Sequence, residues 1–369
     1  MEIHQRSRLV DRVSQRIKHR PKKPMKVGLI GLGRMGEGMS RRMMKDGIEV
    51  WGYRRNYAKA QEAFEAGYVS GVAASLESLV QVVHEQEGMV GKAPGIFQLV
   101  IPAELVEDTL NELLPLLGDG DIIIDHGNSN FKDSRRRAER LAKMGIQYLD
   151  CGTSGGVYGL ERGYCLMVGG ASGAVSVCAP IFRALAPGIT AATRTDPYTR
   201  ATSAEYGWLH CGGPGAGHFV KMVHNGVEYG IMQAYAEGFN ILNHGNLGSK
   251  YVKEGDAEVA PMENPADYQY DIDTVEVAEL WRRGSVVGSW LLDLTADVLR
   301  HDPNLDKFDG GVSDSGEGRW TLHSAVDLGV PTPVISAALF ERFNSRRLGE
   351  YGNKILNGMR YMFGGHNVR

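Results

Sequence analysis

Four polar side chains recur at helical intervals within an otherwise apolar stretch of the sequence. Lys221, His224, Asn225 and Glu228 are spaced i, i+3, i+4 and i+7, which places them on one face of a helix. The stretch from His218 to Met232 is apolar on most sides, so we expect its neighbours to bury this helix. Buried polar groups need partners, and a cleft that holds a substrate supplies them. The pattern predicts a catalytic face.

The residue types on this face are suited to proton transfer. A lysine in a pocket of low dielectric constant loses its charge more easily, so Lys221 can act as a base toward a hydroxyl group. Glu228 can return a proton to another atom of the same substrate, and Asn225 lies between the two on the helix. The sequence thus predicts acid-base chemistry on a small molecule.

A second chemical signal is the glycine turn near residue 31. An apolar run, Lys26–Ile30, enters the turn, a helical stretch follows it, and a second apolar run covers residues 48–53. A GxGxxG turn between strand and helix is the pattern of a dinucleotide site, with phosphates at the helix N-terminus. The predicted coenzyme residues of the turn are Gly31, Leu32, Gly33, Arg34, Met35 and Gly36.

The end of the second strand bears on the choice of coenzyme. NAD-specific sites usually carry an Asp or Glu there, whereas this chain reads Arg54, Arg55 and Asn56 after Tyr53. Guanidinium groups pair with a 2′-phosphate, so NADP is favoured. Arg54 could also stack on an adenine or face solvent, and NAD or dual use stays open.

These two sites require a two-part architecture. Strand and helix patterns alternate from Met25 to Gly169, which predicts a Rossmann domain with a doubly wound, mostly parallel sheet. From about Ser203 long helical stretches replace them, near residues 217–242, 275–300 and 331–343. The predicted fold class is therefore α/β plus all-α. The predicted parts are a basic, flexible extension (1–24), the Rossmann domain (25–202) and an all-helical domain (203–369), with a polar surface loop at 243–271.

Composition narrows the class of protein. A chain of 369 residues with a net charge of −3 suits two globular domains and offers no general footprint for nucleic acid. The four cysteines, Cys151, Cys165, Cys178 and Cys211, lack metal-like spacing, so we expect buried, reduced thiols, no metal and a cytoplasmic location. No apolar run approaches the roughly 20 residues that span a bilayer, and we expect no membrane contact.

Taken together, the motifs resemble those of the decarboxylating 6-phosphogluconate dehydrogenases, within the wider β-hydroxyacid dehydrogenase family. The resemblance runs from Met25 to the C-terminus, apart from the loop at 243–271. Its motifs are the glycine turn, Asp125-His126-Gly127-Asn128-Ser129, Thr153-Ser154-Gly155-Gly156, and Lys221 with His224-Asn225-Gly226-Val227-Glu228-Tyr229. The acid at Glu228 is the narrower sign, because relatives that do not decarboxylate generally lack it.

The resemblance implies a reaction and the residues that carry it. The reaction is oxidation of 6-phosphogluconate with loss of CO2, in the pentose phosphate pathway, by a homodimer or homotetramer with shared active sites. Lys221, Glu228 and Asn225 would be catalytic, and Asn128 would also touch the coenzyme. The substrate residues implied are Asn128, Ser154, Gly155, Gly156, His224, Tyr229, Arg342 and, from a neighbouring subunit's tail, Arg360 and His366.

Some positions depart from the family pattern, and two alternatives remain. Ser315 and Glu317 replace a lysine and a threonine that hold substrate in the longer relatives, and His126 stands where glycine is usual. The chain resembles the shorter branch, in which NAD-preferring members occur. The alternatives are a non-decarboxylating β-hydroxyacid dehydrogenase acting on a small acid such as 3-hydroxyisobutyrate, and a dinucleotide-binding regulator that has lost catalysis.

Overall fold

The computed structural model describes residues 25–85, 94–250 and 262–364. The chain forms two compact units, which divide between Lys221 and Met222. The predicted extension at residues 1–24 lies outside the described residues, and the predicted domain boundary near residue 203 stays a prediction.

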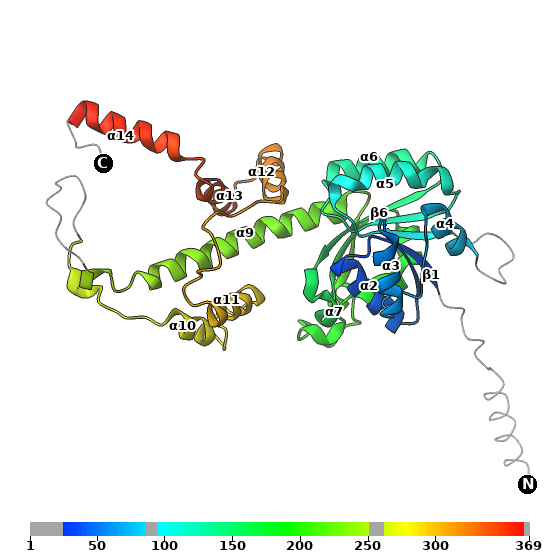
Figure 1. Cartoon of the computed structure of the whole chain (residues 1–369), viewed down its shortest axis with the longest axis horizontal. Coiled ribbons are helices and arrows are strands. Elements are labelled where there is room, and N and C mark those ends of the chain that lie inside the picture. The colour runs from blue at the N-terminus through cyan, green and yellow to red at the C-terminus, as the bar shows by residue number, and fades with distance from the viewer. Residues whose placement is uncertain (1–24, 86–93, 251–261, 365–369) are drawn as a thin grey trace, which may run out of the picture. The chain divides into compact units, whose positions relative to one another are not determined.

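Unit 1 is built on a β-sheet flanked by helices (Figure 1). Its eight described strands lie in the order β3-β2-β1-β4-β5-β6-β7-β8. All neighbouring strands are parallel except β6 and β7, which pair antiparallel. The strands are β1 (Lys26–Ile30), β2 (Glu49–Tyr53), β3 (Gly71–Val72), β4 (Ile96–Leu99), β5 (Ile122–Asp125), β6 (Gln147–Ser154), β7 (Cys165–Gly169) and β8 (Trp208–Gly212).

Helices cover both faces of this sheet. Ile122 and Ile124 of β5 pack into one apolar cluster and Ile123 into another, because successive side chains of a strand point to opposite faces. The first cluster includes α2 (Arg34–Lys45), α3 (Tyr57–Glu65) and α8 (Ser172–Leu185). The second includes α4 (Leu76–His84), α5 (Val106–Leu113) and α6 (Phe131–Ala142), and the short α7 spans Gly159–Arg162. The predicted doubly wound sheet is confirmed.

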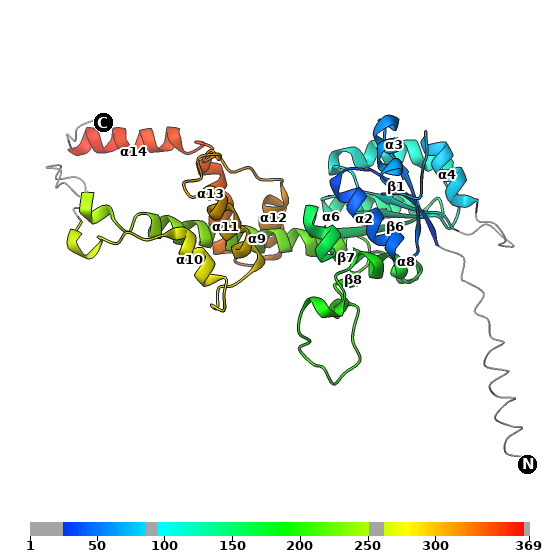
Figure 2. The same cartoon turned by 60° about the horizontal axis from the view of Figure 1, so that its bottom comes forward.

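Helix α9 (Ala216–Asn243) begins in unit 1 and continues through the division into unit 2. In unit 2, Phe239 of α9 packs on α10 (Thr274–Trp281) and α11 (Trp290–His301), and Tyr229 packs on α13 (Pro333–Ser345). Figure 2 shows α12 (Glu317–Leu328) and α13 beside α9. The chain then enters α14 (Glu350–Gly364). The predicted helical C-terminal part is confirmed.

Three details of the sequence prediction were wrong. The stretch 275–300 is two helices, because Gly284 turns the chain at φ +91° and Ser289 caps a new helix by accepting from the Leu292 N–H. Strand β8 lies in the part expected to be helical, where parallel pairing with β7 satisfies its backbone. Cys165 is exposed and Cys211 is half-buried, although all four thiols were expected to be buried.

None of the described helices is both long and apolar enough to pass through a bilayer.

Candidate active site

The glycine turn after β1 has the geometry of a tight approach between strand and helix. Gly31 adopts φ +106°, and a Cβ there would overlap the carbonyl oxygen of Val100. A Cβ on Gly36 would overlap the carbonyl oxygen of Gly31, so the first turn of α2 packs directly on the loop. Gly33, by contrast, faces open space. Gly31 and Gly36 therefore shape the turn, and Gly33 leaves room for a ligand at the start of α2.

The residues after β2 have defined partners. Arg54 donates from Nη1 to the Leu32 carbonyl at 2.9 Å, which holds its guanidinium against the glycine turn. Arg55 is exposed and forms an ion pair with Glu112 at 3.2 Å. The Asn56 side chain caps α3 by accepting from the Lys59 N–H at 3.2 Å. Of the three, Arg54 is the one brought to the turn.

A buried carboxylate shapes the loop after β5. Asp125 accepts hydrogen bonds from the Gly127 N–H (2.9 Å), the Ser129 hydroxyl (2.8 Å) and the Tyr148 hydroxyl (2.6 Å). Burial alone would raise the pKa of Asp125, but the charge of His218 and these three hydrogen bonds lower it below its usual value. The ionised Asp125 thus fixes a loop on which Asn128 is exposed to solvent.

His126, in the same loop, is a buried structural link. One ring nitrogen lies 3.1 Å from the Thr153 hydroxyl, and the other lies 3.1 Å from the Gln98 side-chain oxygen. Burial lowers the pKa of His126 to about 3, although the Asp125 charge acts in the opposite direction. The neutral imidazole therefore links Gln98 of β4 to Thr153 of β6.

Strand β6 ends in the segment predicted to bind substrate. Ser154 is the last residue of β6 and is half-buried. Gly155 and Gly156 have φ values of +136° and +52°, which side-chain-bearing residues rarely adopt. The two glycines therefore allow a sharp turn directly after the last residue of β6.

The start of α9 is anchored on β6 by Asp150, which the sequence prediction missed. The buried Asp150 carboxylate accepts from the Gly215 N–H at 2.7 Å and the His218 N–H at 2.9 Å, and so caps the helix. Its signal was a single acid inside a mostly apolar strand. His218 adds a side-chain link to α6, with Nδ1 2.7 Å from the Ser134 hydroxyl.

Close backbone packing then sets the position of Lys221. A Cβ on Gly152 would overlap the Lys221 Cβ, and a Cβ on Gly217 would overlap the Met167 carbonyl oxygen. Lys221 is 7% exposed. Its charge acts to lower the pKa of Cys165, although burial of that thiol has the larger, opposite effect and raises it. Cys165 pairs with Ser154 across β6 and β7, so Lys221 lies beside the end of β6.

The polar face of α9 runs on from Lys221 along the same helix. His224 Nδ1 lies 3.0 Å from the Asn225 side-chain oxygen and 3.9 Å from a Glu228 carboxylate oxygen. Asn225 is buried, while the His224 and Glu228 side chains are each 38% exposed. The pair His224 and Glu228 has the i, i+4 spacing expected for one face of a helix.

The expected burial of α9 by its neighbours is wrong for a single chain. Several apolar side chains of the helix are between 37% and 48% exposed: Val220, Val223, Val227, Ile231 and Met232. They are not covered because the other described helices of unit 2 pack on other positions of α9, such as Tyr229 and Phe239.

Within unit 2, Tyr229 and Arg342 lie together. Tyr229 is 6% exposed, and the Arg342 guanidinium lies 3.6 Å from the centre of its ring. Arg342 also donates to the Ser313 carbonyl at 2.7 Å, and the Ser315 N–H donates to the Tyr229 hydroxyl at 3.4 Å. Ser315 and Glu317 therefore belong to the same cluster as Tyr229.

The C-terminal residues are only partly described. Arg360 lies on α14, a helix with no buried residue among those described. His366 lies outside the described residues. Among the described residues, no group of three His, Cys, Asp or Glu side chains has the arrangement of a metal site.

Comparisons with known proteins identify related chains. Residues 26–193 match the model for the NAD binding domain of 6-phosphogluconate dehydrogenase, and residues 217–254 match the model for its C-terminal domain. A Bacillus subtilis protein provisionally named a 6-phosphogluconate dehydrogenase is 36% identical, over 93% of this chain and 98% of its own. An NAD(+)-dependent, decarboxylating 6-phosphogluconate dehydrogenase from Haloferax volcanii is also 36% identical, with the same coverage.

A solved structure agrees with these matches. The 6-phosphogluconate dehydrogenase of Plasmodium falciparum, studied in its apo form and with NADP+ or 6-phosphogluconate, superposes with a TM-score of 0.68 at 26% identity. The match covers 93% of this chain and 66% of that one.

Proposed function

We propose a reaction for this chain from one premise: it belongs to the 6-phosphogluconate dehydrogenase family. It is an oxidoreductase with a nicotinamide dinucleotide coenzyme. The proposed reaction is the oxidation of 6-phospho-D-gluconate at C3, followed by loss of CO2 to give D-ribulose 5-phosphate. The observation that carries it is the buried Lys221 of α9, which packs against Gly152 of β6 near the strand end at Ser154.

Lys221 is the proposed base. Lys221 would take the proton of the C3 hydroxyl as C3 is oxidised. Burial suits this role, because it keeps bulk water away from the amine and from the hydroxyl that it would deprotonate. The coenzyme, when bound, supplies the hydride acceptor, and the glycine turn with Gly31, Gly33 and Gly36 would hold its pyrophosphate.

Decarboxylation follows from the chemistry of the oxidised substrate. A β-keto acid loses CO2 because the neighbouring carbonyl accepts the electrons of the breaking C–C bond. Protonated Lys221 would polarise that carbonyl. Glu228 would then protonate C1 of the enediol, and Asn225 and His224 would orient the substrate between them. The spacing of these four side chains on α9 supports the assignment.

The two ends of the substrate have separate proposed binding groups. Asn128, Ser154, Gly155 and Gly156 would bind the carboxylate end and the nicotinamide edge. Tyr229 and Arg342 would bind the phosphate, because a guanidinium forms paired hydrogen bonds with phosphate oxygens.

NADP is the proposed coenzyme, with NAD as the alternative. Arg54 is held at the glycine turn, and no acid occupies the place where one would select NAD. The Haloferax volcanii relative is named as NAD(+)-dependent, so a direct comparison of the two coenzymes is needed.

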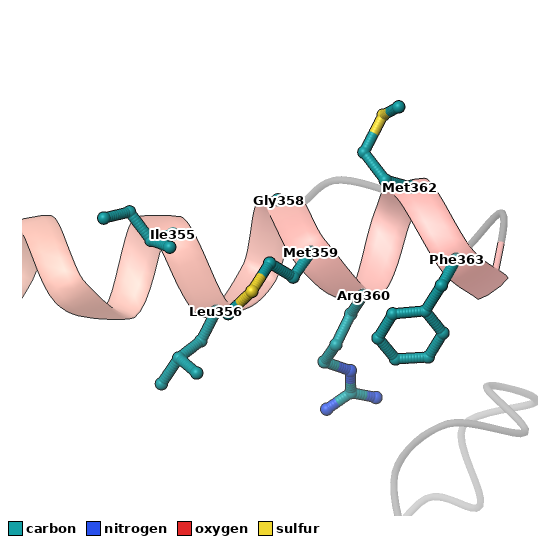
Figure 3. Close-up of a pocket in the computed structure, with 7 residues that line it drawn as sticks. All are labelled: Ile355, Leu356, Gly358, Met359, Arg360, Met362 and Phe363. Atoms are coloured by element: carbon teal, nitrogen blue, oxygen red, sulfur yellow. The ribbon is translucent and has the colours of Figure 1, made fainter.

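A second subunit is proposed to complete the site. Figure 3 shows Leu356, Arg360 and Phe363 on one side of α14. The apolar side chains of Leu356 and Phe363 are 57% and 79% exposed. A helix with so much uncovered apolar surface is suited to packing on another chain. Arg360 and His366 would then reach the phosphate in a neighbouring subunit of a homodimer or homotetramer.

One assay tests the reaction. The purified protein is given 6-phospho-D-gluconate with NADP+ or NAD+, and reduced coenzyme, trapped CO2 and ribulose 5-phosphate are measured together. Equal amounts of the three support the proposal. Reduced coenzyme without CO2 would point to a non-decarboxylating β-hydroxyacid dehydrogenase, and binding of NADPH without turnover would point to a regulator.

A further inference from the structure

The start of α12 holds a buried carboxylate, one oxygen of which has no hydrogen-bond partner among the described residues. Glu317, the first residue of α12, is 2% exposed. Its Oε2 accepts a hydrogen bond from the Ser315 hydroxyl at 2.5 Å. Its Oε1 is also buried and has no hydrogen-bond partner among the described residues. A buried acceptor is costly to leave unpaired, so Oε1 calls for a donor that the described chain does not supply.

The residues on both sides of Glu317 contact Tyr229, which belongs to the cluster proposed to bind phosphate. Gly318 lies against the Tyr229 ring, where an added Cβ would come within 2.7 Å of Cε2. The Ser315 N–H reaches the Tyr229 hydroxyl, and Arg342 covers the face of the same ring. Glu317 thus lies in the chain between two residues that contact Tyr229, the tyrosine whose ring Arg342 covers.

The other charged groups nearby do not supply the missing donor. Asp314 is bound by Arg319 at 2.7 Å and by Arg346 at 3.0 Å, and these partners hold the pKa of that carboxyl below its usual value. Other titratable side chains on these helices of unit 2 include His224, Glu228 and Glu237 of α9, His323 and Asp327 of α12, and Glu341 of α13.

We propose that Glu317 accepts a hydrogen bond from a protonated phosphate oxygen and thereby makes this subsite select oxyanions that carry a proton. The inference rests on the proposed function, and it specifies the protonation state of the phosphate that the subsite binds. An ionised carboxylate only accepts hydrogen bonds. A fully deprotonated phosphate beside it could donate none, and the two negative charges would repel each other. A monoanionic phosphate ester has one P–O–H group to donate, and Arg342 binds its remaining oxygens.

The alternative is that Glu317 only stabilises α12. An acid in the first turn of a helix interacts favourably with the helix dipole. That role would affect the stability of the protein but not its choice between anions, so anion selectivity separates the two.

The test compares inorganic phosphate with sulfate at pH 8. The two anions have the same shape and nearly the same charge there, but only phosphate carries a proton. Each is titrated by calorimetry into the full-length protein, and each is tested as an inhibitor against 6-phospho-D-gluconate. We expect phosphate to bind about tenfold or more tightly than sulfate, the size of effect that one charged hydrogen bond produces.

The Glu317→Gln variant should lose this discrimination. Its amide can donate to either anion, so the preference should fall to about threefold or less, because one acceptor has become a donor. Glu276→Gln is the matched control, because it removes a first-turn acid from α10 that is exposed and paired with Arg300. The control should keep the wild-type ratio.

The substrate gives an independent readout. Phosphate monoesters lose their last proton near pH 6, so the wild-type KM for 6-phospho-D-gluconate should rise above that pH. In Glu317→Gln the rise should be smaller.

Wild-type protein that binds phosphate and sulfate equally would overturn the proposal, whether or not the variant folds. An unchanged ratio in a folded Glu317→Gln protein would do the same. Because calorimetry does not require turnover, selective anion binding without conversion of 6-phospho-D-gluconate would instead refute the proposed function. If the protein neither discriminates between the two anions nor converts 6-phospho-D-gluconate, both proposals are refuted.

Discussion

Gly152 and Lys221 lie so close that a Cβ on the glycine would overlap the Cβ of the lysine. The contact joins β6 to the second turn of α9, across 69 positions of sequence (221 − 152). Because the lysine backbone rests directly on the strand, its position relative to Ser154 depends on this glycine.

Gly152→Ala is expected to move the turn that carries Lys221. The added methyl group has no space, so the helix must shift, and the free energy of unfolding should fall by roughly 1 to 3 kcal/mol. kcat should fall more than coenzyme affinity. Gly173→Ala is the control, because a Cβ there meets nothing within 4 Å. Wild-type kcat in Gly152→Ala would show that the contact does not position the lysine.

Lys221→Met is expected to abolish oxidation while coenzyme binding stays nearly intact. Loss of a general base typically costs on the order of 10² to 10⁴ in rate, and the glycine turn that would hold the coenzyme is not altered. Steady-state rates and a fluorescence titration with NADPH measure the two effects separately. Near-normal turnover would remove Lys221 from the mechanism.

Arg54→Asp is expected to raise KM for NADP far more than KM for NAD. The change exchanges an attraction to the 2′-phosphate for a repulsion. Arg55→Asp is the comparison, because Arg55 is exposed and paired with Glu112. A wild-type preference for NAD of tenfold or more would contradict the coenzyme proposal.

His126 should make the protein less stable in acid. Its pKa is about 3 in the folded chain and about 6.5 when unfolded, so the unfolded state binds the extra proton first. This contribution is fully present above pH 6.5 and is lost as the pH falls toward 3. It should amount to about 2 kcal/mol between pH 8 and pH 5.

Urea unfolding of wild type and His126→Gln at several pH values measures this difference. The stability gap between the two should shrink as the pH falls, because only the wild type carries the titrating ring. His301→Gln, on the surface of α11, should show no such trend. A gap independent of pH would mean that His126 is not kept neutral by the fold.

Removal of the residues after Asn357 is expected to weaken 6-phospho-D-gluconate binding by about 2 kcal/mol or more, with little change in coenzyme affinity. The sharper measurement mixes two inactive variants, Lys221→Met and Arg360→Ala, under conditions where subunits exchange. Activity should return if the tail acts in a neighbouring subunit. Verified hetero-oligomers without activity would contradict a shared site.

Local patterns in the sequence were enough to predict the fold class and the polar face of α9. The turn at Gly31 and Gly36 was recognisable because strand, turn and helix are neighbours in the chain, and backbone sterics alone demand glycine there. The stripe from Lys221 to Glu228 followed from helical spacing. Both depend on contacts within a few residues, which a single sequence records directly.

Contacts between distant segments were decided only by the tertiary structure. Asp150 caps α9 from a strand 65 residues before Gly215, and Ser315, which donates to Glu317, also donates to Tyr229 of α9. Neither position carries a local signal of its partner. Arg54 and Arg55 look equivalent in sequence, yet one binds the Leu32 carbonyl and the other Glu112. The sequence determined which chemical groups are present and which helix carries them, whereas packing determined their partners, because burial and hydrogen bonding depend on segments that meet only in the folded chain.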